Sequence, residues 1–344
     1  MTNKAAVYRG DKTFTLEEKT IAPPGPGEVQ IKVAYCGICG TDLHIYLGHM
    51  DKRVGFERTI GHEMSGTVAA IGEDVTGFRT GQPIVVRPLD HCGKCPACEA
   101  GHEHICHNLK FIGIDTEGAF QEYWNVPAHT LHALPDGLDL SHAALIEPLA
   151  VACHDVHRAR VAPGEDVLVI GGGPIGLLVA LVARQAGGKV VISEISENRL
   201  AYAEKLGFRT VNPKTDDPVA AVNQLTGKKG ADVVFEVSGS QAGVDLMTAA
   251  AATRARIVMV AIHASKPSVD MFQFFWRELE LFGARVYRPE DYDEAMRYLA
   301  EGVVDCTSFI TDIQPLEDIQ AAFEALIGNP SAIKSMIQID GNAK

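Results

Sequence analysis

The chain has 344 residues, 46% of them hydrophobic, and a formal net charge of −13 at pH 7. This length allows two domains, each with its own core, and the hydrophobic share is ordinary for a globular protein. The excess of acidic residues argues against nucleic acid and anionic membranes as partners, because both are bound through basic patches.

The eight cysteines and the N-terminal segment indicate a cellular compartment. The opening run MTNKAAVYRGDKTF has no apolar stretch of the signal-peptide type. Cysteines in a chain without such a signal favour the reducing cytoplasm, where thiols bind metals instead of forming disulfides. The most apolar stretch, 167–183, is interrupted by glycines and a proline, so we expect a cytoplasmic protein without a membrane-spanning segment.

The first 150 residues are predicted to be rich in β-strands. Short apolar runs bounded by Gly, Pro or Asp recur there, at 29–40, 66–78 and 82–88. The run 29–40, VQIKVAYCGICG, is typical of a strand that enters a tight glycine turn. The N-terminal part is therefore expected to be a β-rich domain.

From about residue 163 onward, strands and helices are predicted to alternate. The predicted strands span 166–170, 189–194, 231–239, 254–262 and 279–287, and the first two helices span 174–186 and 197–206. Such alternation is typical of a doubly wound parallel sheet in an α/β protein. Amphipathic helices are predicted at 291–302 and 316–327, and composition does not assign them to either domain.

Two turns in the β-rich part carry possible metal ligands, Cys39 in CGICGTDLH and the pair His62-Glu63 in IGHEMSG. A thiolate and an imidazole from two turns can hold zinc and leave a coordination position open. Glu147 stands in the apolar run ALIEPLAVACH, where a carboxylate is costly unless it is paired or binds a cation. Each residue alone would be an ordinary turn or core residue, but together they are candidate ligands of one metal ion.

A dense cysteine array follows, in the run DHCGKCPACEAGHEHIC. Its spacing is CxxCxxC-x7-C, formed by Cys92, Cys95, Cys98 and Cys106. Four thiolates at this spacing can surround one tetrahedral cation, and zinc fits best. An iron–sulfur cluster is the alternative, but the last spacing differs from that of ferredoxins and no second cluster motif occurs.

Residues 171–176, GGGPIG, satisfy the G-x-G-x-x-G pattern of a dinucleotide-binding turn. A predicted strand precedes the turn and a predicted helix follows it, so the free N–H groups of the helix start can bind the pyrophosphate. The residues expected to contact the cofactor here are Gly171, Gly173, Pro174, Ile175 and Gly176.

Two residues beyond the turn bear on the choice of cofactor. Glu194 ends the next predicted strand, and its carboxylate is expected to accept hydrogen bonds from the adenosine ribose and to repel a 2′-phosphate. This favours NAD over NADP. Arg199 can stack on the adenine or help to bind a 2′-phosphate, so NADP remains an alternative cofactor.

Taken together, the motifs resemble those of the zinc-dependent medium-chain alcohol dehydrogenases across essentially the whole chain. The resemblance is carried by CGICGTDLH, IGHEMSG, CGKCPACEAGHEHIC, ALIEPLA and VLVIGGGPIGLL. Within this family the sequence is similar to the polyol branch, the sorbitol and threonine dehydrogenases. Glutamate stands at position 147, where the simple alcohol branch has cysteine.

The resemblance implies a domain organisation and a set of cofactors. It implies a GroES-like catalytic domain, residues 1–155 and 290–344, and an inserted Rossmann NAD-binding domain, residues 156–289. It implies two zinc ions per subunit, a catalytic one and a structural one held by the cysteine array in a lobe at about residues 90–110. It also implies a homo-oligomer, commonly a tetramer in bacterial relatives.

The resemblance further implies the reaction, a hydride transfer from a secondary hydroxyl of a polyol, sugar alcohol or sugar acid to NAD+, which gives a ketone. Zinc, with Cys39 and His62 as ligands, is expected to lower the pKa of the substrate hydroxyl as a Lewis acid. Glu63 and Glu147 remain alternatives for the further ligand.

Three residues near Cys39 are implied in proton transfer and ligand orientation. Thr41 is expected to take the substrate proton, and His44 to pass it on to solvent. Asp42 is expected to orient the ring of His62.

Two other functions remain open from the sequence. A threonine-type or other alcohol dehydrogenase would keep the fold and change the substrate, and the residues of the substrate pocket are not identifiable. A non-catalytic protein that binds zinc and NAD is the other alternative. It is disfavoured because such a protein needs neither an open metal site nor a proton relay.

Overall fold

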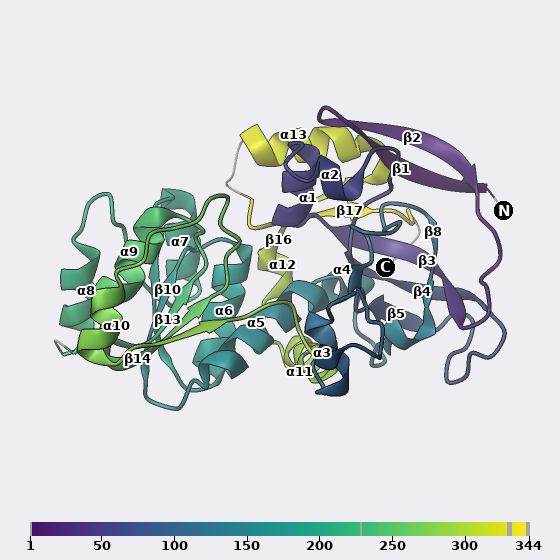
Figure 1. The fold of residues 1–344 in the computed structure, drawn as a ribbon. Coiled ribbons are helices and arrows are strands. Elements are labelled where there is room, and N and C mark those ends of the chain that lie inside the picture. Colours follow the sequence, from purple (N-terminus) through teal and green to yellow (C-terminus); the bar gives the residue numbers. More distant parts are fainter. Residues whose placement is uncertain (1, 228, 329–331, 342–344) are drawn as a thin grey trace. The chain divides into compact units, whose positions relative to one another are not determined.

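The computed structural model describes residues 2–227, 229–328 and 332–341 (Figure 1). The chain divides into two compact units, the first from residues 1–147 and 288–344 and the second from residues 148–287. Within the described ranges, no helix combines the length and the apolar character needed to cross a membrane.

The first unit is built on a mixed seven-stranded sheet, in the order β16-β17-β3-β4-β5-β9 with β8 paired to β3. The strands are β3 Glu28–Gly37, β4 Glu63–Ile71, β5 Pro83–Val86, β8 Tyr123–Pro127, β9 Leu131–Ala133, β16 Ile310–Pro315 and β17 Lys334–Gln338. The late strand β17 pairs antiparallel with the early strand β3, with Met336 opposite Gly37. This pairing brings the C-terminal part of the chain to the end of β3.

Shorter elements surround this sheet. The strand pairs are β1 Thr2–Gly10 with β2 Thr13–Thr20, and β6 Leu89–Asp90 with β7 Lys110–Phe111. The helices are α1 Gly40–Tyr46, α2 Asp51–Val54, α3 Pro96–Glu99, α4 Leu140–Ala143, α11 Pro289–Ala300, α12 Cys306–Phe309 and α13 Ile319–Gly328, with single 3-10 turns η1 Glu103–Ile105, η2 Ala128–Thr130 and η3 Leu316–Asp318. Helix α5, Ile146–Ala159, begins at the end of the first unit and continues into the second.

Aromatic packing assigns α13 to the first unit. The ring of Phe323 on α13 lies 4.8 Å from Phe14 on β2 and 6.0 Å from Phe120, measured between centroids. Phe323 and Phe120 are completely buried. The amphipathic helix predicted at 316–327 is therefore confirmed, and its apolar face covers the N-terminal hairpin.

The second unit is a six-stranded sheet in the order β12-β11-β10-β13-β14-β15, and every neighbouring pair is parallel. Its strands are β10 Asp166–Ile170, β11 Lys189–Ser193, β12 Arg209–Val211, β13 Ala231–Glu236, β14 Ala251–Met259 and β15 Glu280–Gly283. Its helices are α6 Pro174–Gln185, α7 Glu197–Lys205, α8 Pro218–Leu225, α9 Gln241–Ala249 and α10 Met271–Arg277. This is the strand order of a doubly wound nucleotide-binding sheet, so the predicted α/β fold class is confirmed.

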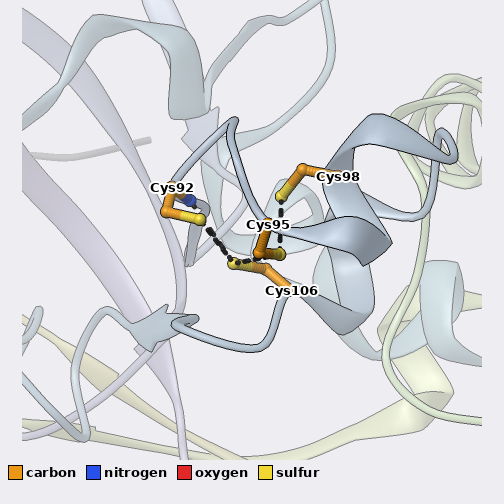
Figure 2. A group of neighbouring side chains, drawn as sticks. All are labelled: Cys92, Cys95, Cys98 and Cys106. Atoms are coloured by element: carbon orange, nitrogen blue, oxygen red, sulfur yellow. Dashed lines mark hydrogen bonds between the residues drawn. The ribbon is translucent and has the colours of Figure 1, made fainter.

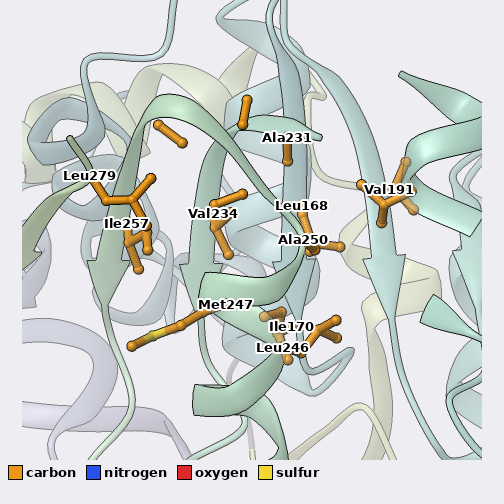
Figure 3. Packing of buried hydrophobic residues seen from close by; sticks show 14 of the residues in the cluster. Leu168, Ile170, Val191, Ala231, Val234, Leu246, Met247, Ala250, Ile257 and Leu279 are labelled. Atoms are coloured by element: carbon orange, nitrogen blue, oxygen red, sulfur yellow. The ribbon is translucent and has the colours of Figure 1, made fainter. Parts of the chain in front are cut away.

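The core of the second unit explains why its strands read as continuous apolar runs. Side chains of the central strands, such as Leu168, Val234 and Ile257, pack against Val244 and Met247 of α9 (Figure 3). A parallel sheet with helices packed on it buries its strands and selects Val, Ile and Leu at successive positions.

The sequence prediction missed several elements and was wrong about the extent of one. The hairpin of β1 and β2, helix α5 and the strands β16 and β17 were not predicted. The last strand of the parallel sheet was predicted over 279–287 but pairs with β14 only from Glu280 to Gly283. Beyond this point Val286 adopts a left-handed φ of 49°, so the chain cannot continue as a strand.

Candidate metal and cofactor sites

Three of the predicted zinc ligands converge at the end of β3 and the start of β4. Ligand atoms of Cys39, His62 and Glu63 all lie within 4.8 Å of one another. The antiparallel register places Gly37 opposite Glu63, so the turn after β3 and the first residues of β4 meet. The fourth candidate, Glu147, is buried in the first turn of α5 but is not a member of this group.

Helix α1 follows directly from Cys39, and its start is stabilised by a side chain of its first turn. Cys39 is the N-cap residue, and its backbone N–H donates to the Asp42 carboxylate at 2.9 Å. Thr41 is half-buried, whereas His44, one helical turn further on, is exposed and lies 3.1 Å from His49, Nδ1 to Nδ1. The two residues of the predicted proton relay are therefore neighbours on α1, one of them in contact with solvent.

Asp42 also faces the ring of His62. Oδ1 of Asp42 lies 3.6 Å from Nδ1 of His62, and both side chains are almost completely buried. Neither atom has a hydrogen-bond partner among the described residues. This places Asp42 where a carboxylate orients a metal-binding histidine through its second nitrogen.

The site concentrates groups whose ionisation is strongly perturbed. Burial, reinforced by Glu63, raises the pKa of the Cys39 thiol. Burial raises the pKa of Asp42 to about 6. Burial lowers the pKa of His62, but the neighbouring Asp42 and Cys39 more than offset this and raise it well above its ordinary value. These buried acidic groups favour positive charge at this point, and a divalent cation would supply it.

A buried lysine that the sequence analysis missed lies beside the group of Cys39, His62 and Glu63. Lys334, at the start of β17, is only 3% exposed, and its ammonium group donates to Glu63 and, at 3.0 Å, to the carbonyl oxygen of Ile38. Burial by itself would lower the pKa of Lys334, but the negative charges of Glu63 and Cys39 outweigh this effect. The pKa of Lys334 is therefore raised above its ordinary value. The available sequence signal was a lysine at the start of the apolar run SMIQI.

The four array cysteines come together in the lobe of β6, α3, η1 and β7 (Figure 2). All four are free thiols whose sulfur atoms lie within 4.8 Å of one another. The Sγ–Sγ distances are 3.5 Å for Cys95–Cys98, 3.8 Å for Cys95–Cys106 and 3.5 Å for Cys92–Cys106. A zinc tetrahedron with Zn–S distances of about 2.3 Å has edges of about 3.8 Å, so the sulfur spacing suits zinc.

Backbone N–H groups point at the sulfurs of this array. The N–H of His107 donates to Cys95 at 3.4 Å, and the N–H of Asn108 donates to Cys106 at 3.2 Å. Hydrogen bonds from the Lys94 backbone and the Asn108 side chain lower the pKa of Cys92 to about 6. Such donors stabilise thiolates, the form of cysteine that binds metal.

The glycine-rich turn joins β10 to α6 in the second unit. Gly171 has a φ of 105°, which a residue with a side chain rarely adopts. A Cβ atom at Gly176 would collide with the carbonyl oxygen of Gly171, so glycine is required where the helix passes close to the strand end. Gly173 is the N-cap of α6, and Pro174 is its first residue. The turn therefore presents the N-terminus of a twelve-residue helix.

Glu194 and Arg199 both lie beside this turn. The carboxylate of Glu194 accepts from the backbone N–H groups of Gly172 at 2.7 Å, Ile195 at 2.7 Å and Ser196 at 2.9 Å. Since a carboxylate offers about four acceptor positions, one is left for a ribose hydroxyl. The guanidinium of Arg199 lies 3.8 Å from Glu194, and among the described residues its buried Nε has no partner.

Comparison with known proteins agrees with this arrangement. The profile of the alcohol dehydrogenase GroES-like domain matches residues 25–136, and that of the zinc-binding dehydrogenase family matches residues 174–301. The chain is 55% identical, over 97% of its length and 98% of the relative's, to a 2-dehydro-3-deoxy-L-galactonate 5-dehydrogenase of Pseudoalteromonas atlantica. It is 32% identical to the L-galactonate-5-dehydrogenase of Escherichia coli, over 98% and 99% of the two chains.

A solved structure extends the comparison to the fold. A candidate zinc-binding dehydrogenase from Sinorhizobium meliloti, bound to NADP, superimposes with a TM-score of 0.91 at 31% identity and covers 98% of this chain and 100% of its own. The relatives are matched over nearly their whole length in both units. The chain therefore belongs to the zinc-dependent medium-chain alcohol dehydrogenase family and is an oxidoreductase that uses zinc and a nicotinamide cofactor.

Proposed function

We propose that this chain oxidises a secondary hydroxyl of a sugar acid to a ketone, with NAD+ as the hydride acceptor. The observation that carries the proposal is the group of Cys39, His62 and Glu63, which brings a thiol together with a buried imidazole and a buried carboxylate. Two relatives named as 5-dehydrogenases of galactonate-type sugar acids support the substrate class.

Each residue near the metal group has a distinct part in the proposed reaction. When bound, zinc supplies a Lewis acid that makes the substrate hydroxyl more acidic. Cys39 and His62 hold the ion, with Glu63 or Glu147 as a further ligand, and Asp42 keeps the His62 ring in orientation. The hydroxyl of Thr41 would accept the substrate proton while passing its own proton on, and the exposed His44 would release that proton to solvent. A bound nicotinamide would supply the hydride acceptor.

The second unit is proposed to bind NAD, with the pyrophosphate at the turn Gly171–Gly176. Gly171, Gly173, Pro174, Ile175 and Gly176 are proposed to contact the cofactor there. The buried Glu194 beside the turn would be close to a 2′-phosphate, which favours NAD over NADP. Arg199 is proposed to contact the adenosine end, where its Nε, which has no hydrogen-bond partner among the described residues, provides a donor.

A panel of substrates tests this function directly. Purified protein is assayed for NADH formation with 2-dehydro-3-deoxy-L-galactonate, L-galactonate, sorbitol, L-threonine and ethanol, and then with NADP+ in place of NAD+. We expect kcat/KM for a sugar acid to exceed that for ethanol by about 10²-fold or more, because a site built to pair polar groups rejects ligands that lack them. Prolonged chelation should abolish turnover and zinc should restore it.

Other results of the panel would point elsewhere. A preference for L-threonine would move the protein to the amino-acid branch of the family. Turnover that survives complete metal removal would contradict the role of Cys39 and His62. Tight NAD binding without turnover on any substrate would favour a non-catalytic zinc protein.

A homo-oligomer, with a tetramer as the favoured state, is proposed on the basis of an exposed aromatic surface. Met271, Phe272, Phe275 and Trp276 on α10 are 60–77% exposed, and the rings of Phe272 and Trp276 stack at 5.9 Å. Contiguous exposed apolar residues of this kind mark interaction surfaces. A cytoplasmic location is proposed because Cys39 and the four array cysteines are free thiols, as expected in a reducing compartment.

Phe275→Glu should weaken self-association by about 30-fold, the effect of losing one aromatic anchor at an interface. Phe56→Glu is the matched control, because Phe56 is also 60% exposed but belongs to the first unit, whereas α10 belongs to the second. Light scattering over a dilution series gives the mass of both variants. An unchanged mass for Phe275→Glu, or an equal loss for Phe56→Glu, would contradict an interface at α10.

A further inference from the structure

The metal group forms a buried ion pair with a residue that is not a predicted ligand. Lys334 and Glu63 are 3% and 1% exposed and form an ion pair through Nζ and Oε2. They are 271 positions apart in the sequence. The carbonyl oxygen of Ile38 accepts a second hydrogen bond from the same ammonium group at 3.0 Å. A buried ion pair of this kind is stable only when its hydrogen bonds are also satisfied.

The surrounding backbone is shaped to hold this pair. Strand β3 lies between β4, which begins with Glu63, and β17, which begins with Lys334. A Cβ atom at Gly37, the last residue of β3, would collide with the Glu63 carboxylate and lie 2.9 Å from Cε of Lys334. Glycine at this position therefore leaves the space in which the two charged groups meet.

The pair is part of the metal group and not a separate bridge. One carboxylate oxygen of Glu63 lies within 4.8 Å of the Cys39 and His62 ligand atoms, and Oε2 contacts Lys334. The Glu63 carboxylate therefore contacts the Lys334 ammonium group and also lies where a metal cation would bind. A cation that draws on Glu63 has to weaken the contact with Lys334 or share the carboxylate with it.

We propose that Lys334 is a positioning residue of the metal site, which holds Glu63 in an ion pair and thereby limits the contribution of this carboxylate to cation binding. The inference rests on the proposed zinc site at Cys39 and His62. Lys334 lowers the zinc affinity of the site. When no zinc is bound, its ammonium group balances the negative charge of the Glu63 carboxylate. A purely structural lysine would have the opposite effect, because its removal would damage the site and weaken zinc binding.

Neutral and charge-conserving variants of Lys334 separate these two roles. Lys334→Gln removes the charge and keeps an amide donor, Lys334→Met removes both, and Lys334→Arg keeps the charge. The zinc dissociation constant is measured on the full-length protein by competition with a chromophoric chelator. The relevant zinc is identified as the one that is lost in Cys39→Ser.

We expect the neutral variants to bind this zinc about 10- to 100-fold more tightly, the range in which groups around a metal site alter its affinity. Lys334→Arg should stay close to wild type. In a Glu63→Gln background the increase in zinc affinity caused by Lys334→Gln should be smaller by about 3- to 100-fold, as expected for side chains in direct contact. The visible spectrum of the cobalt-substituted protein should change in Lys334→Gln but not between Glu63→Gln and the double variant.

The outcomes separate this inference from the proposed function. Weaker zinc binding by the neutral variants would overturn the role proposed for Lys334. The role would also be overturned if Lys334→Gln raised the zinc affinity equally with Glu or with Gln at position 63. If Lys334→Met does not fold alone, the Lys334→Met/Glu63→Gln double variant, which has no unpaired charge, provides the same comparison with Glu63→Gln. The absence of any Cys39-dependent zinc in the wild type would instead overturn the proposed metal site itself.

Discussion

Cys39→Ser should lower kcat by at least about 10³-fold, because loss of a Lewis acid removes several kcal/mol of transition-state stabilisation. The serine hydroxyl does not ionise near neutral pH and is a poor zinc ligand, so the zinc content should fall by one ion per chain. The dinucleotide turn belongs to the second unit and Cys39 to the first, so NAD binding should remain within about twofold of wild type. Steady-state kinetics, metal analysis and a fluorescence titration with NADH measure the three quantities.

The matched control for Cys39→Ser is Cys306→Ser. Cys306 is also a free thiol of the first unit, buried in α12, and is not a member of either group of possible metal ligands among the described residues. It should retain both zinc ions and near-normal kcat. A Cys39→Ser protein with wild-type turnover, or with two zinc ions, would show that Cys39 is not a ligand of the catalytic metal.

Cys98→Ser should act on stability before it acts on chemistry. A structural zinc contributes its binding free energy to folding, so its loss should lower Tm by about 5–15 °C. The zinc content should again fall by one ion per chain, while kcat of the folded fraction should stay within about threefold of wild type, since the array is a site separate from the Cys39 group. Calorimetry with metal analysis, followed by kinetics at low temperature, tests both statements.

The comparison of Cys98→Ser with Cys39→Ser makes the two zinc roles distinguishable. Each variant should lose one ion, but only Cys39→Ser should lose activity at full stability. A Cys98→Ser protein that is stable and inactive would contradict the structural role of Cys92, Cys95, Cys98 and Cys106. An iron–sulfur cluster at the array would colour the purified protein, and a colourless protein would exclude it.

The sites that the sequence predicts most completely are those made of residues close together in the chain. The four array cysteines lie within fifteen positions, so only a few turns of backbone were needed to bring their sulfurs to 3.5–3.8 Å. The strand, glycine turn and helix at 166–185 are likewise contiguous. In both cases local backbone geometry and residue spacing already limit where the functional atoms lie.

The sequence analysis missed elements whose partners are distant in sequence, or did not assign them to a domain. Strands β16 and β17 belong to the sheet only through their pairing with each other and with β3, which is some three hundred positions earlier. Local propensity carries no information on such pairing, because the stability of a strand depends on its neighbours in the sheet. For the same reason composition did not assign the helix at 316–327 to either domain, and only the family resemblance placed it in the catalytic domain. In the structure Phe323 of this helix packs against Phe14.

The sequence alone predicted the family, the cysteine array and the dinucleotide turn, because the array and the turn depend on residue types at short spacing. The tertiary structure decided that Glu63 lies with Cys39 and His62 and that Lys334 forms an ion pair with Glu63. These contacts follow from the register of β3 with β4 and β17. Register is set by packing over the whole unit, so a buried lysine 271 residues from its partner becomes visible only when the strands are paired.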